Sequence, residues 1–186
     1  PRESFARQLG LITHELLQWV CTYHPQTIEQ LPWNFIEQRC KQYGFNPEQC
    51  QSTKKTLQEQ IMAMLSTPVG QWICQKHDDE KNEYALLVKY EGLVKTRVID
   101  RTFIHHNIRW IIDFKTGLDD QNKQEQHAKQ VNHYAQLLAT MSELPIHIGI
   151  YYLASQRWVH WEYNLQKKKG SVRYNLFKCF KNVIQA

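Results

Sequence analysis

Two short segments of this chain carry residue types that can act on phosphate esters. One reads VIDR and holds Asp100, and the other reads IIDFKTG and holds Asp113 and Lys115 two positions apart. Side chains alternate along a strand, so Asp113 and Lys115 would share one face while Phe114 points into a core. Carboxylates bind Mg²⁺ or Mn²⁺, which polarise a phosphate and lower the pKa of a bound water. An amine can stabilise the negative charge that develops.

These residues must be brought together by the strands that carry them. Residues 94–105 and 108–115 are rich in β-branched and aromatic side chains, and His106-Asn107 between them is suited to a tight turn. Such a hairpin would place Asp100 beside Asp113, where two carboxylates repel each other unless a cation binds. A lone D-x-K is more often a surface ion pair, but the apolar residues before both acids favour a site.

The remaining elements indicate an α/β layered domain. Apolar spacing predicts helices over residues 5–20, between Pro32 and Gly44, and after a capping box at Asn46 and Gln49. Strands are predicted at 84–90, 94–105, 108–115, 145–153 and 157–163. A helix at 124–141 separates the third strand from the fourth, and a further helix is expected at 171–184.

Composition narrows the class of protein. A chain of 186 residues suits one domain, and the net charge of +5 is concentrated in residues 164–186, which hold six basic and no acidic residues. Such a segment suits a nucleic acid, or is simply a solvated terminus. No apolar run is long enough to span a bilayer and no signal peptide is present, so we expect no membrane association. Five scattered cysteines without a C-x-x-C pair suggest a reducing compartment, with neither zinc nor a disulfide framework.

Taken together, these segments resemble the PD-(D/E)XK nucleases of the RecB type, and within them the C-terminal nuclease domains of AddA-like and RecB-like helicase–exonucleases. The segment GLITH at 10–14, the acid Glu83, the Q-x-x-x-Y pair Gln130 and Tyr134, and IGIYYL at 148–153 occur in the family's order. The resemblance runs from Gly10 to about Trp161. It implies a restriction-endonuclease-like core, with a mixed central sheet flanked by helices.

The resemblance also implies an organisation. Residues 1–186 would form a single nuclease domain, with a mainly helical section at 1–75, a catalytic sheet and helix at 83–163, and a basic helix or tail at 164–186. Because the chain begins with Pro1, we expect it to be a piece of a longer protein.

The site implied by the resemblance has defined roles. His14, Asp100 and Asp113 would bind Mg²⁺, replaceable by Mn²⁺, together with the backbone carbonyl of Phe114. Asp100, Asp113 and Lys115 would be catalytic. Three further residues are candidates for DNA contacts: Gln130, Tyr134 and Arg101. A structural ion pair is the alternative for Arg101. Some relatives hold an iron–sulfur cluster through several late cysteines, but only Cys179 lies late here, so no cluster is expected.

These expectations favour a Mg²⁺-dependent deoxyribonuclease, the exonuclease domain of an ATP-dependent helicase–nuclease in double-strand-break repair. No P-loop is present, so the motor would lie elsewhere in the parent chain. The expected partners are single-stranded DNA ends, that motor and a RecC-like or AddB-like subunit, in the bacterial cytoplasm. Two alternatives stay open: a DNA-binding scaffold of the same fold without activity, and a structure-specific endonuclease.

Overall fold

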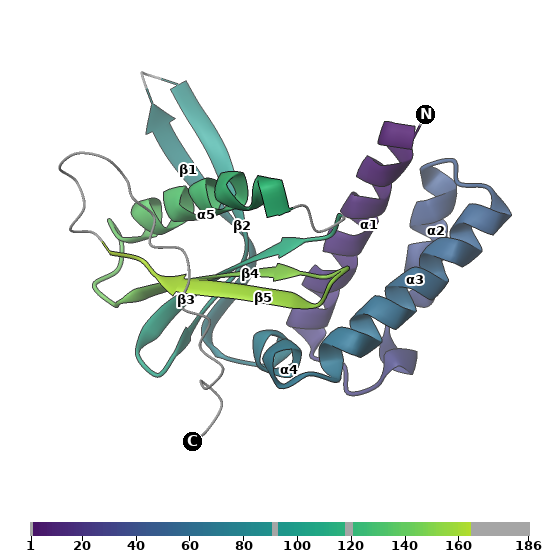
Figure 1. Cartoon of the computed structure of the whole chain (residues 1–186), viewed down its shortest axis with the longest axis horizontal. Helices are drawn as coiled ribbons and strands as arrows, with labels where there is room; N and C mark the ends of the chain where they lie inside the picture. The colour runs from purple at the N-terminus through teal and green to yellow at the C-terminus, as the bar shows by residue number, and fades with distance from the viewer. Residues whose placement is uncertain (1, 91–92, 118–120, 165–186) are drawn as a thin grey trace. The chain divides into compact units, whose positions relative to one another are not determined.

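The computed structural model describes residues 2–90, 93–117 and 121–164 (Figure 1). The chain divides into two compact units. One is mainly helical and comprises residues 1–76 with two short segments, 114–119 and 152–157, at the ends of strands. The other comprises residues 77–113, 120–151 and 158–186, within which the sheet and one helix are described.

The helical unit contains α1 (Arg2–Tyr23), α2 (Trp33–Gln42), α3 (Pro47–Leu65) and α4 (Pro68–Cys74), with the short 3-10 helix η1 (Ile28–Gln30) before α2. Asn46 caps α3: its side chain accepts from Gln49 N at 2.8 Å, while Gln49 Oε1 accepts from Asn46 N at 2.9 Å. The unit buries an apolar stripe from each long helix, including Leu16, Ile36, Ile61 and Ile73. Burying each such side chain contributes about 1.5–3 kcal/mol.

The sheet has five strands in chain order, β1-β2-β3-β4-β5, and is mixed. They are β1 (Asp78–Tyr90), β2 (Leu93–His105), β3 (Ile108–Lys115), β4 (Ile146–Tyr152) and β5 (Arg157–Glu162). The 3-10 helix η2 (Gln121–Lys123) and α5 (Gln124–Leu138) connect β3 to β4. This order confirms the predicted fold class.

The first three strands form an antiparallel meander. β1 pairs with β2 from Asp78↔Ile104 to Tyr90↔Leu93, and β2 pairs with β3 from Arg101↔Ile112 to His105↔Ile108. The β2–β3 turn is made by His106 and Asn107, whose φ angles of 50° and 61° are both positive. Two positive φ values in succession define the tight hairpin turn that matches strand twist, as the sequence predicts.

β3 and β4 are parallel. Arg109 N donates to Pro145 O, and Leu153 N donates to Lys115 O, each at 2.9 Å. From the first bond to the second, the residue number rises along β3 and along β4 alike, so the two strands run in the same direction. Parallel neighbours need a long crossover, and α5 supplies it.

α5 covers the face of the sheet that carries Asp113. Trp161 of β5 donates from Nε1 to Asn132 Oδ1 on α5 at 3.1 Å. Tyr163 N donates to Ile146 O at 2.8 Å, so the chain just past the end of β5 pairs with the start of β4, and the two strands are antiparallel. Trp161 therefore lies on the same face as every second residue of β4, counted from Ile146. Carried across the parallel β3–β4 pairing, the same alternation places Asp113 on this face.

Most predicted elements agree with the structure within a few residues. The main difference is β1, which begins at Asp78 rather than at residue 84. The helix expected at 171–184 lies outside the described residues. No helix in the described part of the chain combines the length and apolarity needed to cross a membrane.

Candidate active site

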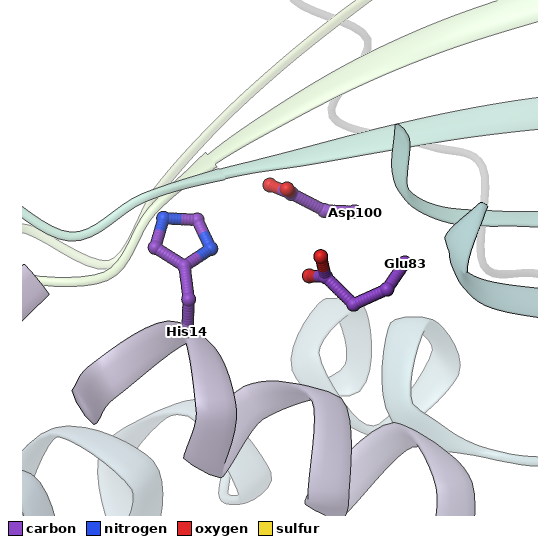
Figure 2. A group of neighbouring side chains, drawn as sticks. All are labelled: His14, Glu83 and Asp100. Carbon is purple, nitrogen blue, oxygen red and sulfur yellow. The ribbon is translucent and has the colours of Figure 1, made fainter. Parts of the chain in front are cut away.

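Two carboxylates from neighbouring strands form the centre of the candidate site. Glu83 of β1 and Asp100 of β2 lie between the pairs Asn82↔Arg101 and Tyr84↔Ile99. A carboxylate oxygen of Glu83 lies within 4.8 Å of one of Asp100. Figure 2 draws both side chains together with His14, and each of the three offers one atom that can bind a metal. Two acids this close favour a bound cation.

The backbone at Glu83 departs from regular strand geometry. Its φ of 50° lies in the left-handed region, which is uncommon for a residue other than glycine and costs about 1–2 kcal/mol. The carboxyl group is partly withdrawn from water although the residue as a whole is exposed, and this burial raises its pKa. A strained, partly desolvated acid is typical of a functional position rather than of a solvated strand.

Asp113 lies on β3, the strand that follows the acidic pair. The β2–β3 register reaches Arg101↔Ile112, and one further step along both strands sets Asp100 opposite Asp113. Opposed residues of an antiparallel pair share a face, so this register assigns Asp113 to the face that carries Asp100. The group of ligand atoms within 4.8 Å of one another comprises His14, Glu83 and Asp100 and does not include Asp113. Asp113 is only 4% exposed. A carboxylate so buried is costly to fold unless positive charge or hydrogen-bond donors compensate it.

Lys115 follows Asp113 by two residues on β3 and is half-buried, whereas Phe114 between them is 3% exposed. Strand alternation therefore places the carboxylate and the amine on one face and the ring on the other, as the sequence predicts. The backbone carbonyl of Lys115 accepts from Leu153 N at 2.9 Å, which anchors this end of β3 to the segment after β4.

His14 belongs to the helical unit and is half-buried on α1. One turn earlier, a Cβ added at Gly10 would lie 3.4 Å from Thr116 Oγ1, just past the end of β3. Within this unit, α1 therefore lies close to the residue after Lys115, near enough for a side chain at position 10 to contact Thr116.

Gln130 and Tyr134 lie one turn apart on α5 and are bonded to each other. Gln130 Nε2 donates to the Tyr134 hydroxyl oxygen at 2.9 Å. Gln130 is exposed, while Tyr134 is 6% exposed. The buried phenol thus fixes the orientation of an exposed amide, on the helix that covers the sheet face carrying Asp113.

Arg101 has a different environment. Its side chain is fully buried, donating to Asn82 Oδ1 at 2.7 Å and to Glu80 Oε2 at 3.0 Å, and its guanidinium lies 5.1 Å from the Phe103 ring centroid. Alternation along β2 turns Arg101 to the face opposite Asp100. These contacts support the structural ion pair, the second of the two roles left open by the sequence, and give the DNA contact no support.

The donors present suit a hard divalent cation. Carboxylate oxygens are the ligands that Mg²⁺ and Mn²⁺ prefer, and an imidazole is compatible with Mn²⁺. Glu83 was not among the ligands predicted from the sequence, although its place before an apolar strand resembles an acidic family position. The sequence did not indicate that β1 begins before Glu83, because residues 78–83 are polar and show no alternation of apolar and polar side chains.

A comparison with protein families identifies the relationship of this chain. Residues 1–176 match the PD-(D/E)XK nuclease superfamily, so the match includes both compact units and every candidate residue. Among curated proteins, no sequence matches significantly. A match over most of the length, together with the five-stranded mixed sheet, establishes the relationship. The chain belongs to the PD-(D/E)XK nuclease superfamily, whose members are metal-dependent nucleases.

Proposed function

We propose that this chain hydrolyses phosphodiester bonds of DNA with a divalent cation, Mg²⁺ in the cell. The observation that carries the proposal is the placement of three acids on the neighbouring strands β1, β2 and β3, with Lys115 on the same face as Asp113. Superfamily membership supplies the reaction class, since its members act on nucleic acids.

In this proposal Glu83, Asp100, Asp113 and His14 hold the cation, with the Phe114 carbonyl as a further ligand. When bound, the cation supplies positive charge to the phosphate and lowers the pKa of water. The superfamily match over both units supports treating residues 1–176 as one functional domain.

Lys115 has the chemistry of a transition-state stabiliser. Its ammonium can donate to a nonbridging phosphate oxygen as negative charge develops there, or orient the attacking water. The Gln130 amide, oriented by Tyr134, can donate to a DNA phosphate and set the register of the strand. We assign Gln130 and Tyr134 to positioning the DNA.

Cleavage of single-stranded DNA with Mg²⁺ or Mn²⁺ tests the proposal. Asp113→Ala should abolish cleavage, whereas Asp78→Ala, at an exposed acid of the same unit, should leave it intact. Undiminished cleavage by Asp113→Ala would refute the site. Calorimetric titration with Mn²⁺ separates an active nuclease from an inactive scaffold, because the scaffold should bind no ion.

Finer parts of the proposal rest on motif order. The succession from GLITH to Q-x-x-x-Y supports an exonuclease domain of a RecB-like or AddA-like helicase–nuclease that processes broken DNA ends, with a RecC-like or AddB-like partner in the bacterial cytoplasm. A circular single-stranded substrate tests the exonuclease assignment. Linear DNA should be degraded and the circle spared, whereas cutting of the circle would identify an endonuclease.

A further inference from the structure

The connection between α2 and α3 fixes the last turn of one helix against the first turn of the next. Gly44, whose φ is 77°, ends α2, and across it Phe45 N donates to Cys40 O at 3.0 Å. This bond belongs to the motif in which a residue with left-handed backbone closes a helix. Asn46 then caps α3, and Cys50 N donates to Asn46 O at 2.9 Å. Two consecutive local motifs thus set the separation of Cys40 and Cys50.

The two cysteines meet at Phe45. Its backbone N–H is bonded to Cys40 O, and its carbonyl oxygen accepts from Cys50 Sγ at 3.6 Å. Both cysteine side chains are free thiols. Burial, together with the neighbouring Cys50 thiol and a hydrogen bond between the two, raises the pKa of the Cys40 thiol to about 11. The two thiols are therefore neighbours in the reduced protein, as the partners of a disulfide must be.

Access differs between the two thiols. Cys40 is 1% exposed, whereas Cys50 is half-buried and lines a groove of about 450 Å³ between α2 and α3. The surface of this groove is mainly apolar, with Lys41 and Lys54 among its lining residues. A small neutral oxidant can enter the groove and reach the Cys50 sulfur. The raised pKa keeps Cys40 protonated at neutral pH, and because the thiolate is the reactive form, Cys50 is the first of the pair to react.

We propose that Cys40 and Cys50 form a reversible oxidation site, at which a peroxide converts the two thiols into a disulfide that joins α2 to α3. This inference goes beyond the proposed nuclease function and does not depend on it. A reversible bond also suits the reducing compartment expected from the sequence, because disulfides in such compartments are transient and sense oxidants.

The chemistry takes two steps. In the first, the Cys50 sulfur attacks hydrogen peroxide: an S–O bond forms, the O–O bond breaks, and the leaving hydroxide takes up the thiol proton to become water. In the second, the Cys40 sulfur attacks the Cys50 sulfur: the S–S bond forms, the S–O bond breaks, and the released hydroxide takes up the Cys40 proton as a second water. The thiol pair loses two electrons and the peroxide gains them. A thiol reductant reverses the reaction by exchange.

The neighbouring thiol gives the site two properties. Cys40 consumes the sulfenic acid of Cys50 before further peroxide can convert it irreversibly to the sulfinic acid. The bond also closes a short loop, because the two cysteines are ten positions apart in the chain. A cross-link that fits the native packing removes conformational freedom from the unfolded chain. The oxidised protein should therefore melt about 5–10 °C above the reduced protein.

Intact-mass analysis of the full chain carrying Cys179→Ser tests the proposal, since this change removes the late cysteine as an exchange partner. The folded protein is treated with hydrogen peroxide, denatured and alkylated. It should lose the mass of two hydrogen atoms and take up alkyl groups on two thiols fewer than the reduced sample, and peptide mapping should recover Cys40 linked to Cys50. Dithiothreitol should restore both thiols. Cys74→Ser, at a buried cysteine of the same unit, is the matched control and should leave the bond unchanged.

Two variants test the order of the steps. Cys50→Ser should form no disulfide, and Cys40→Ser should hold Cys50 as a sulfenic acid that dimedone traps. The main result needs neither variant to fold, because the Cys40–Cys50 pair itself is intact in the mass measurement. A disulfide to any other cysteine overturns the proposal, as does oxidation of Cys50 to the sulfinic acid with Cys40 still open to alkylation. A melting temperature that is unchanged or lower after oxidation also overturns it, because the bond would then not fit the packing of α2 on α3.

Discussion

Replacing Glu83 by Gln removes one candidate ligand while keeping the side chain's size and the strained backbone. Burial raises the pKa of this carboxyl, so its charged form is less favourable in the folded protein than in the unfolded chain. Ionisation of Glu83 therefore lowers the free energy of unfolding of the wild type as pH rises above the ordinary Glu pKa of about 4.3. The Gln variant lacks this contribution. In EDTA at neutral pH, Glu83→Gln should melt no lower than the wild type.

A divalent ion should reverse this order. An ion at about 100 times its Kd stabilises the folded state by about 2.7 kcal/mol, and a variant that binds about 100-fold more weakly gains only about 0.4 kcal/mol. For a domain of this size, about 2–4 °C accompany each kcal/mol, so the difference of about 2.3 kcal/mol corresponds to about 5–9 °C. Differential scanning fluorimetry with and without Mn²⁺ measures both quantities. An equal Mn²⁺-induced shift in the two proteins would refute the assignment of Glu83 as a ligand.

Three further substitutions test the structure around the site. Arg101→Leu removes the buried cation that pairs with the partly exposed Glu80 and bonds Asn82, so it should lower the free energy of unfolding by about 1.5–3 kcal/mol in urea titrations. Weakened DNA binding at unchanged stability would contradict the structural role of Arg101. The guanidinium of Arg109 lowers the pKa of the Asp79 carboxyl, so Asp79→Asn should lower the free energy of unfolding by at most about 1 kcal/mol. This loss should be present at neutral pH and disappear once pH falls through the lowered pKa. A loss that does not depend on pH would exclude the ion pair as its cause. Gly149→Ala puts a Cβ 1.8 Å from the Trp158 ring and should cost about 1–3 kcal/mol and alter tryptophan fluorescence, and unchanged fluorescence would show that the ring does not cover this glycine.

Local patterns predicted much of the fold because local physics decides those parts. The turn at His106 and Asn107 follows from the tolerance of Asn for positive φ, and the start of α3 follows from the reciprocal bonds of Asn46 and Gln49. The bounds of β3 were predicted without error, because its apolar residues lie between turn residues on both sides. The facing of Asp113 and Lys115 follows from strand alternation alone.

Other features depend on tertiary pairing that a sequence pattern does not report. The first residues of β1 are polar and become strand only because β2 offers them a ladder, from Asp78↔Ile104 onward. That pairing places Glu83 beside Asp100, and the backbone at Glu83 has a positive φ angle that the sequence does not indicate. Arg101 stands next to Asp100 in sequence, yet the strand turns them to opposite faces, and the positive charge of Arg101 is accommodated there by contacts that include Glu80 and Asn82.

The simple strand order has a consequence for how the protein folds. The three candidate acids all belong to the β1-β2-β3 meander, whose hairpin turns close short loops at low entropic cost. The β3–β4 pairing, by contrast, must wait for a crossover through η2 and α5, and such distant parallel contacts are slow to form. We therefore expect the carboxylates to be aligned early in folding, before α5 docks, so that a divalent ion present at that stage can accelerate folding as well as stabilise the final structure.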